Sequence, residues 1–153
     1  MSDTLTPAQR HKCMSLVKGK DTAPEFLIRK ALFAEGFRYK LHDKSLPGKP
    51  DLVFPKYKAV IFIHGCFWHM HDCPAFSWPV TRKAFWKKKI TGNAARDKKA
   101  VTALNDQGWR VLIVWECALK GKIRLPIDKV ITDTAKWLKT GKQDNVIQGK
   151  SKA

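Results

Sequence analysis

Apolar residues recur along the chain with two different periods, and the change of period separates predicted helices from predicted strands. Two stretches, 6–17 and 22–36, open with the motifs TPAQ and TAPE, in which a capping Thr precedes Pro and a Gln or Glu side chain. Both motifs are typical of helix N-termini. The second stretch should end at Gly36, and its helically spaced apolar residues are Leu27, Ile28, Ala31 and Leu32.

Three further stretches follow the patterns of strands. Apolar and polar residues alternate over 37–41, before the turn LPGKP at 46–50. The stretches DLVF at 51–54 and AVIFI at 59–63 are separated by PKYK and predict a β-hairpin. AVIFI contains no polar position, so we expect it at the centre of a sheet, covered on both faces.

The second half of the chain predicts a long crossover and a final helix. Residues 81–107 lack strand alternation and predict one or two helices, with Gly92 as the candidate break. The apolar stretch WRVLIVW at 109–115 follows and is expected to form a strand parallel to a neighbour. The last helix would be amphipathic, with one face made of Ile127, Val130, Ile131, Thr134 and Leu138.

These elements predict an α/β fold, with helices flanking a small mixed sheet in the order α-α-β-β-β-α-β-α. We expect one domain over residues 1–141, and a disordered tail from the polar and basic residues 142–153. With 153 residues in all, the chain is long enough to bury a core without relying on disulfides.

Lysine and arginine outnumber the acids by 30 to 13, which gives a formal charge of +17. Such a charge attracts polyanions, and nucleic acid is the leading partner class, although ribosomal and membrane-surface proteins can be as basic. The sequence has no long apolar run and no charged-then-apolar leader. We therefore expect a soluble, cytoplasmic protein with reduced cysteines and no membrane partner.

The stretch HGCFWHMHDC at 64–73 concentrates metal-binding side chains. Zn²⁺ prefers four tetrahedral ligands drawn from Cys and His. Cys66, Cys73 and a histidine between them would supply three, and Cys117, just past the last predicted strand, would supply the fourth. Four protein ligands leave no position for water, so such a zinc site would be structural.

Two features of this cluster stay open in the sequence. The spacing fits His69 and His71 equally well as the histidine ligand. The alternative interpretation is a set of unrelated buried thiols and polar histidines. The remaining cysteine, Cys13, falls outside the scheme and is interpreted as an ordinary helix residue.

Asp51 follows a Pro turn at the start of a predicted strand, where a carboxylate can face a cleft. Mg²⁺ takes one or two carboxylates together with water and substrate phosphate, so Asp51 is a candidate ligand, although most Asp residues after a turn only cap it. In restriction-endonuclease-like cores the adjacent strand then carries an acid, an apolar residue and a Lys. Here residues 62–64 are FIH, with no second acid and with His64 in place of the Lys.

Three further polar residues are candidates for the same cleft. Glu25 is the third residue of a predicted helix, which a capping box explains equally well. Asp97 is the lone acid within ARDKK, and its alternative is a surface ion pair. His69, if it does not bind zinc, could orient or deprotonate a water beside a metal-bound phosphate, because its charge changes near neutral pH.

Residues 82–99, RKAFWKKKITGNAARDKK, carry eight cations and one acid, with two aromatic residues among them. A cationic surface binds phosphates, and exposed aromatic rings can stack on bases or insert between base steps. We expect Phe85 in the core and Trp86 as a candidate for base contact. Phe67 and Trp68, on the loop of the predicted zinc site, are candidates for the same role.

Four motifs together resemble the very short patch repair (Vsr) endonuclease family. They are SLPGKPDLVF, VIFIHGCFWHMHDC, TRKAFWKKKI with Asn93, Arg96 and Asp97, and GWRVLIVWECAL, in one order within residues 10–121. The resemblance implies a Mg²⁺-dependent DNA endonuclease with a restriction-enzyme-like core that lacks the usual acid and Lys. It implies a nick on the 5′ side of the thymine in a T:G mismatch, which arises when 5-methylcytosine deaminates.

The resemblance also implies catalytic roles. Asp51 becomes the Mg²⁺-binding carboxylate, together with the main-chain carbonyl of Ile63, where we expect Thr in the family. His69 becomes the base that activates water, and His64 a supporting group. Two acids become outer residues that bind metal-bound waters or orient that base: Glu25 and Asp97.

The resemblance also implies which residues bind zinc and which enter the DNA. The implied zinc ligands are Cys66, His71, Cys73 and Cys117. The implied DNA-inserting residues are Phe67, Trp68 and Trp86, with Met14 in a DNA-contacting N-terminal helix over residues 1–20. Because a T:G pair stacks and pairs less well than a matched pair, opening the duplex there costs less free energy. The loop departs from the family at Met70 and Asp72, neither of which has an implied role.

Two other functions stay open. A zinc-stabilised DNA-binding module without catalysis would keep the same fold. A nuclease of this fold could instead act on matched or branched DNA, because Ile63 departs from the family. The implied partner is double-stranded DNA with a T:G mismatch, mismatch-repair proteins are candidate partners, and we expect a monomer because one nick needs one active site.

Overall fold

A computed structural model describes residues 23–74 and 76–150. The elements in chain order are helix α2 (Ala23–Ala34), strands β1 (Lys40–Leu41) and β2 (Leu52–Phe54), the 3-10 turn η1 (Pro55–Tyr57), strand β3 (Ala59–His64), helix α3 (Lys83–Asp106), strand β4 (Arg110–Trp115), the 3-10 turn η2 (Glu116–Ala118), helix α4 (Ile127–Thr140) and strand β5 (Asn145–Ile147). Among these helices none is long and apolar enough to cross a membrane. The helix predicted over 6–17 and the residues Cys13 and Met14 lie outside the described residues.

The five strands form one mixed sheet in the order β1-β2-β3-β4-β5. Strands β1, β2 and β3 are antiparallel neighbours, and Phe54 pairs with Ala59 across the predicted hairpin. Strand β4 is parallel to β3, with Ile61 opposite Leu112, which confirms the parallel pairing expected after a long helical crossover. Because β5 is also parallel to β4, three strands end at the same edge of the sheet.

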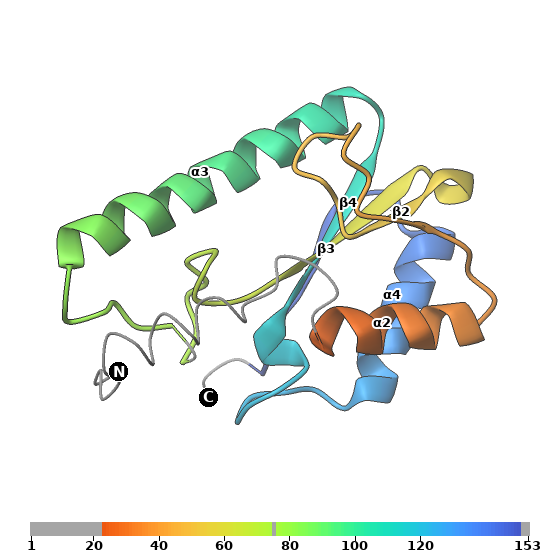
Figure 1. The fold of residues 1–153 in the computed structure, drawn as a ribbon. Helices are drawn as coiled ribbons and strands as arrows, with labels where there is room; N and C mark the ends of the chain where they lie inside the picture. The colour runs from red at the N-terminus through yellow and green to blue at the C-terminus, as the bar shows by residue number, and fades with distance from the viewer. Residues whose placement is uncertain (1–22, 75, 151–153) are drawn as a thin grey trace.

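Helices cover both faces of the sheet, so the fold has three layers, as the sequence predicted (Figure 1). Helices α2 and α4 lie on one face, where Ile28 and Leu138 join the larger apolar cluster. Helix α3 crosses the other face, where Leu104 packs with Val60 and Phe62. The side chains of β3 alternate between these two clusters, which is why a strand without polar positions forms at the centre.

Residues 81–107 contain one helix, the first of the two alternatives predicted: α3 continues through Gly92, because a single glycine costs a helix only about 1 kcal/mol relative to alanine, and a helix of 24 residues tolerates that. Other local predictions were wrong. Leu27 is 43% exposed and Ile127 is 38% exposed, so neither belongs to the core. Trp137 is buried on α4 instead. Of the strand predicted over 37–41, only the last two residues pair.

The prediction of a disordered tail over 142–153 was also wrong, because residues 145–147 form β5 along β4. The exposed edge of β4 offers unpaired main-chain groups, which a short strand can satisfy whatever the polarity of its flanks. Asp144 fixes the start of this pairing, since its carboxylate accepts hydrogen bonds from the Val111 N–H and the Asn105 amide, both at 2.8 Å. Residues 151–153 lie outside the described part of the chain.

Candidate active site and metal centre

Three titratable side chains from separate segments meet beside the sheet: Glu25 from α2, His42 after β1 and Asp51 before β2. Their potential ligand atoms all lie within 4.8 Å of one another. His42 Nε2 lies 2.9 Å from Glu25 Oε2, and His42 Nδ1 lies 3.7 Å from Asp51 Oδ1. Glu25 is only 2% exposed and also accepts a hydrogen bond from Arg29 at 2.9 Å. It is therefore an interior carboxylate, not an exposed helix cap.

The antiparallel register explains how two of these residues meet. Leu41 pairs with Leu52, so the next residues outward, His42 and Asp51, lie opposite one another, and the His42 N–H donates to the Asp51 main-chain carbonyl at 3.2 Å. The Asp51 carboxylate accepts a hydrogen bond from the Ile63 N–H at 2.7 Å, which joins it to the end of β3. Burial raises the pKa of Asp51 to about 6, although the Ile63 N–H opposes this shift. A buried carboxylate beside a second one fits a divalent cation.

A second cluster of side chains lies around the last residue of β3. His69 Nδ1 lies 2.6 Å from Asp97 Oδ2, and the His64 and His69 rings stack 3.8 Å apart with 4° between their planes. The contact with Asp97 favours the His69 tautomer that carries its hydrogen on Nδ1. The Nε2 atom of His69 is then left to accept a proton, which is what a general base requires.

His64 differs from His69 in its surroundings. Burial lowers the pKa of His64 to about 3, so its ring is neutral near pH 7 and does not repel a protonated His69. Its Nδ1 atom is buried and has no hydrogen-bond partner within the described residues. Unpaired buried polar atoms are rare in folded proteins, and this one belongs to a ring that lines a cleft of about 640 Å³ together with His69 and Asp97. The cleft can therefore hold water or a polar ligand.

The two clusters are joined through the last two residues of β3. Ile63 contacts the acidic cluster through its main-chain N–H, whereas the His64 ring belongs to the imidazole cluster. Both are therefore held by one central strand, which is rigid because it is paired on both sides. Such an arrangement can bind a cation at the acidic cluster and move a proton at the imidazole cluster, on either side of the end of β3.

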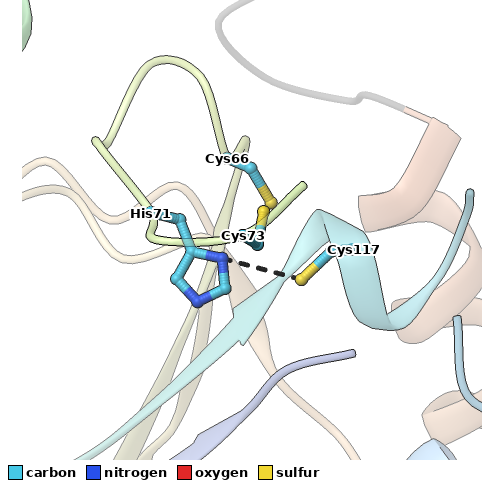
Figure 2. Close-up of side chains that lie close together, drawn as sticks. All are labelled: Cys66, His71, Cys73 and Cys117. Carbon is cyan, nitrogen blue, oxygen red and sulfur yellow. Dashed lines mark hydrogen bonds between the residues drawn. The ribbon is translucent and has the colours of Figure 1, made fainter. Parts of the chain in front are cut away.

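Four soft ligands converge beyond the same edge of the sheet (Figure 2). Potential ligand atoms of Cys66, His71, Cys73 and Cys117 lie within 4.8 Å of one another, and the three cysteines form no disulfide. Because β3 and β4 are parallel, the loop after β3 meets the turn after β4, as the sequence predicted. His71 Nδ1 lies 3.6 Å from Cys117 Sγ, so the cluster contains His71 and not His69.

The local fold of the loop explains how its side chains are sorted. The His71 N–H donates to the Cys66 carbonyl at 2.9 Å, and the His69 N–H to the Gly65 carbonyl at 3.2 Å. Met70 has a left-handed backbone with φ of 54°, which turns the chain between His69 and His71. As a result Cys66 and His71 are buried, whereas the residues between them are partly or fully exposed.

The donor set fits a structural zinc ion. Three sulfurs and one imidazole nitrogen are ligands that Zn²⁺ prefers, and together they would supply its usual four ligands. Burial raises the pKa of the Cys66 and Cys117 thiols, because a buried thiolate without a cation is unfavourable. A bound metal ion would reverse this preference by neutralising the thiolates.

Aromatic rings gather between the loop and α3. The ring centroids of Phe67, Trp68 and Trp86 lie between 5.2 and 5.9 Å apart, and all three side chains are half-buried. The Asn93 amide holds the loop to α3 by donating to the Trp68 carbonyl at 3.0 Å. Phe85, which we expected in the core, is 46% exposed beneath the guanidinium of a neighbouring arginine.

Helix α3 carries the predicted basic surface. All eight cations of residues 82–99 are exposed: Arg82, Lys83, Lys87, Lys88, Lys89, Arg96, Lys98 and Lys99. The helix extends past the sheet at its N-terminal end, toward the loop after β3 (Figure 1). A long cationic helix is thus located beside the aromatic rings and the imidazole cluster.

Known proteins are similar in sequence to this chain along most of its length. A sequence model described as DNA mismatch endonuclease Vsr matches residues 2–75. DNA mismatch endonuclease Vsr of Escherichia coli (strain K12) is 43% identical over 138 residues, which cover 90% of this chain and 88% of that protein. The chain belongs to the DNA mismatch endonuclease Vsr family. The type II nicking enzyme V.NmeAIP of Neisseria meningitidis is 48% identical over 122 residues, 80% of this chain and 87% of that protein.

The fold has a nuclease counterpart as well. The catalytic domain of the homing endonuclease I-Bth0305I aligns with a TM-score of 0.51 and 22% identity, over 78% of this chain and 97% of that one. At this identity the likeness concerns the fold alone. Membership of the Vsr family identifies the chain as a DNA endonuclease of mismatch repair, and the interpretation as a non-catalytic DNA-binding module was therefore wrong.

The structure divides the residues predicted for the catalytic cleft between two clusters, and it places the four predicted zinc ligands in a third. The sequence analysis missed His42, which lies between two candidate acids, and it gave no role to Asn93, whose amide holds the loop to α3. Pairing of His42 with Asp51 follows from the β1–β2 register, and only that register could have revealed it. Asn93 lies four residues before Asp97, so both face the loop from one side of α3.

The raised pKa of Asp51 predicts how the stability of the metal-free chain depends on pH. The folded value of about 6 exceeds the ordinary value of 3.8, so the folded chain binds this proton more tightly than the unfolded chain. That contribution is complete below about pH 4 and is lost as the pH rises through 6. Asp51→Asn cannot ionise, so at pH 8 it should exceed wild type by about 2–3 kcal/mol in free energy of unfolding.

Urea denaturation without Mg²⁺, at pH 4.5 and pH 8, measures this difference. The advantage of Asp51→Asn should shrink toward the acidic end. An equal difference at both values of pH would mean that Asp51 ionises normally in the folded chain.

Proposed function

We propose that this protein is a Mg²⁺-dependent endonuclease that nicks double-stranded DNA on the 5′ side of the thymine in a T:G mismatch. The observation that carries the proposal is the adjacency of Trp68 and His69. One loop thus joins a ring suited to stacking on bases with an imidazole whose Nδ1 is hydrogen-bonded to Asp97. Contact with a disturbed base step and hydrolysis of a nearby phosphodiester would then be coupled through a single turn of backbone.

Asp51 and the main-chain carbonyl of Ile63 would hold Mg²⁺. The ion would supply charge stabilisation to the phosphate and acidify a bound water. Glu25 and His42 would orient the Asp51 carboxylate and hold outer waters, since His42 lies between the two acids. Ile63 in place of Thr is compatible with this role, because a main-chain ligand does not depend on the side chain.

His69 would remove the proton from the attacking water. Asp97 holds Nδ1–H of the ring, so that Nε2 accepts the proton and the carboxylate stabilises the imidazolium that forms. His64 stacks on this ring in its neutral form and lines the same cleft, where it would help to position His69. His64 is thus a supporting group and not a second base.

Cys66, His71, Cys73 and Cys117 would bind a structural Zn²⁺. Four protein ligands would leave no position for water, so this metal would take no part in the reaction. The loop that it fixes carries Phe67, Trp68 and His69. Zinc would therefore maintain the spacing between the stacking rings and His69, the proposed general base.

Phe67, Trp68 and Trp86 would enter the duplex beside the mismatch. They already contact one another, which lowers the entropy lost when they are ordered by DNA. The cations on α3 would bind the flanking phosphates and set the register without reading sequence. Met14, the proposed N-terminal wedge, belongs to the part of the chain that is not described.

The first experiment compares Mg²⁺-dependent nicking of two labelled duplexes that differ in one pair, T:G or T:A, within a CC(A/T)GG-derived site. Cleavage of the mismatched duplex alone, directly 5′ of the thymine, is expected. Equal cleavage of both duplexes would overturn the mismatch specificity and favour the alternative of a nuclease for matched or branched DNA. Light scattering of the protein bound to DNA measures its mass and so tests the proposed monomer. An increase in that mass after addition of mismatch-repair proteins would identify them as partners.

A further inference from the structure

The segment that follows β5 passes directly beside the Cys/His cluster. Strand β5 pairs with β4 up to Val114 opposite Ile147, and β4 ends one residue later. Because the two strands are parallel, the next residues of each chain segment leave the sheet at the same edge. Gln148 and Gly149 are therefore neighbours of Cys117.

Three hydrogen bonds attach this segment to the cluster and its surroundings. Gln148 Oε1 lies 2.8 Å from His71 Nε2 and accepts its hydrogen. The Gly149 N–H donates to Cys117 Sγ at 3.3 Å, and the Lys150 N–H donates to the Ile123 carbonyl at 2.7 Å. Two of the four candidate zinc ligands thus have a partner in the last described residues of the chain.

The contact with Gln148 decides which nitrogen of His71 can bind a metal ion. With its hydrogen on Nε2 and directed at Gln148, the ring has a lone pair on Nδ1, the atom that faces Cys117. Trp115 stacks on the same ring at 4.0 Å with 12° between the planes, which limits its rotation. The ring is therefore oriented for a metal ion before one binds.

The position of Gly149 has a steric cause. A Cβ atom there would lie 2.7 Å from the Cys117 carbonyl oxygen and 2.6 Å from Ile123 Cγ1. Any side chain would force the backbone away from Cys117, and the N–H to sulfur hydrogen bond would lengthen. Glycine thus permits the close approach that the contact requires.

From these contacts we propose that residues 148–150 form the outer shell of the Cys/His metal site. Gln148 is a positioning residue for His71, and the Gly149 N–H stabilises the Cys117 thiolate when metal is bound. Because the segment contacts two ligands, metal binding and docking of the segment strengthen each other by the same factor. This inference rests on the proposed zinc site and adds residues that do not touch the metal ion.

Metal affinity of the full chain tests the role of Gln148. Its side chain is at the surface, so substitution there leaves the core intact. Gln148→Ala should weaken Zn²⁺ binding about 10- to 100-fold in competition with a chromogenic chelator, the usual cost of losing a partner of a ligating histidine. Gln148→Glu should bind within a few-fold of wild type, because a carboxylate accepts the same hydrogen bond.

Gln143→Ala is the matched control, since Gln143 lies in the same segment before β5 and has an exposed side chain. Its Zn²⁺ affinity should equal that of wild type. Equal affinities for Gln148→Ala and Gln143→Ala would overturn the role of Gln148. A weakened Gln148→Glu would also contradict it, because the loss would then not follow the hydrogen bond.

Hydrogen exchange tests the coupling from the other direction. Addition of Zn²⁺ should slow exchange of the Gly149 and Lys150 amides in wild type, and less so in Gln148→Ala. Unchanged exchange at these amides, in a chain that binds the ion, would overturn the coupling alone. Binding of Co²⁺ by wild type gives the separate check, because a chain without the visible absorption of tetrahedral thiolate-bound Co²⁺ would lack the metal site itself.

Discussion

Asp51→Asn should abolish Mg²⁺-dependent nicking of the T:G duplex, with a loss of about 10³-fold or more in the single-turnover rate. The substitution keeps the shape of the side chain, and the Asn carbonyl oxygen can still accept the Ile63 N–H. What it removes is the negative charge that would hold the cation beside the phosphate. Since the fold and the main-chain contacts persist, the loss should appear in the rate and not in DNA binding.

Two comparison variants make this result specific. Asp106→Asn makes the same chemical change at the exposed C-terminal end of α3 and should nick at the wild-type rate. Asp97→Asn should lose about 10²-fold, because His69 would keep a neighbour but lose the carboxylate that stabilises its protonated form. Full nicking by Asp51→Asn, with DNA binding unchanged, would show that the cation is held elsewhere.

The sequence was sufficient for the parts of the site that depend on local spacing or on one long-range rule. Cys66, His71 and Cys73 lie within one loop, and the parallel β3–β4 pairing brings Cys117 to them. Spacing alone left the choice between His69 and His71 open, and the family resemblance assigned His71. In the structure His71 lies beside the three cysteines and His69 does not, because Met70 turns the chain between the two histidines.

What could not be predicted depends on pairings that leave no periodic signal. Strand β1 has two residues, too few to show alternation, yet its register brings His42 to Asp51. Strand β5 has three residues in a polar segment, and it forms because the edge of β4 is available. Composition predicted a tail there, whereas the pairing turns the same residues into neighbours of Cys117.

Removing the proposed zinc ion should lower the thermal midpoint of the chain by about 8–16 °C. A metal ion present at about 1,000 times its Kd contributes about 4 kcal/mol to stability, and the midpoint of a domain of this size shifts by about 2–4 °C per kcal/mol. The loop has few buried apolar side chains of its own, so its conformation would depend on the metal ligands. Calorimetry under reducing conditions, before and after chelation, measures the shift.

Cys117→Ser should reproduce this loss without chelation, since it removes the ligand that joins the loop to the end of β4. Cys13→Ser changes the one cysteine that the proposal leaves outside the metal site, and its midpoint should match wild type. The chelated chain should also fail to nick when only Mg²⁺ is restored, because the loop that carries Trp68 and His69 is then no longer fixed. If Cys117→Ser kept the wild-type midpoint and Zn²⁺ content, Cys117 would not be a metal ligand, and the contact of the loop with the rest of the fold would have to come from Asn93 and Asp97 on α3.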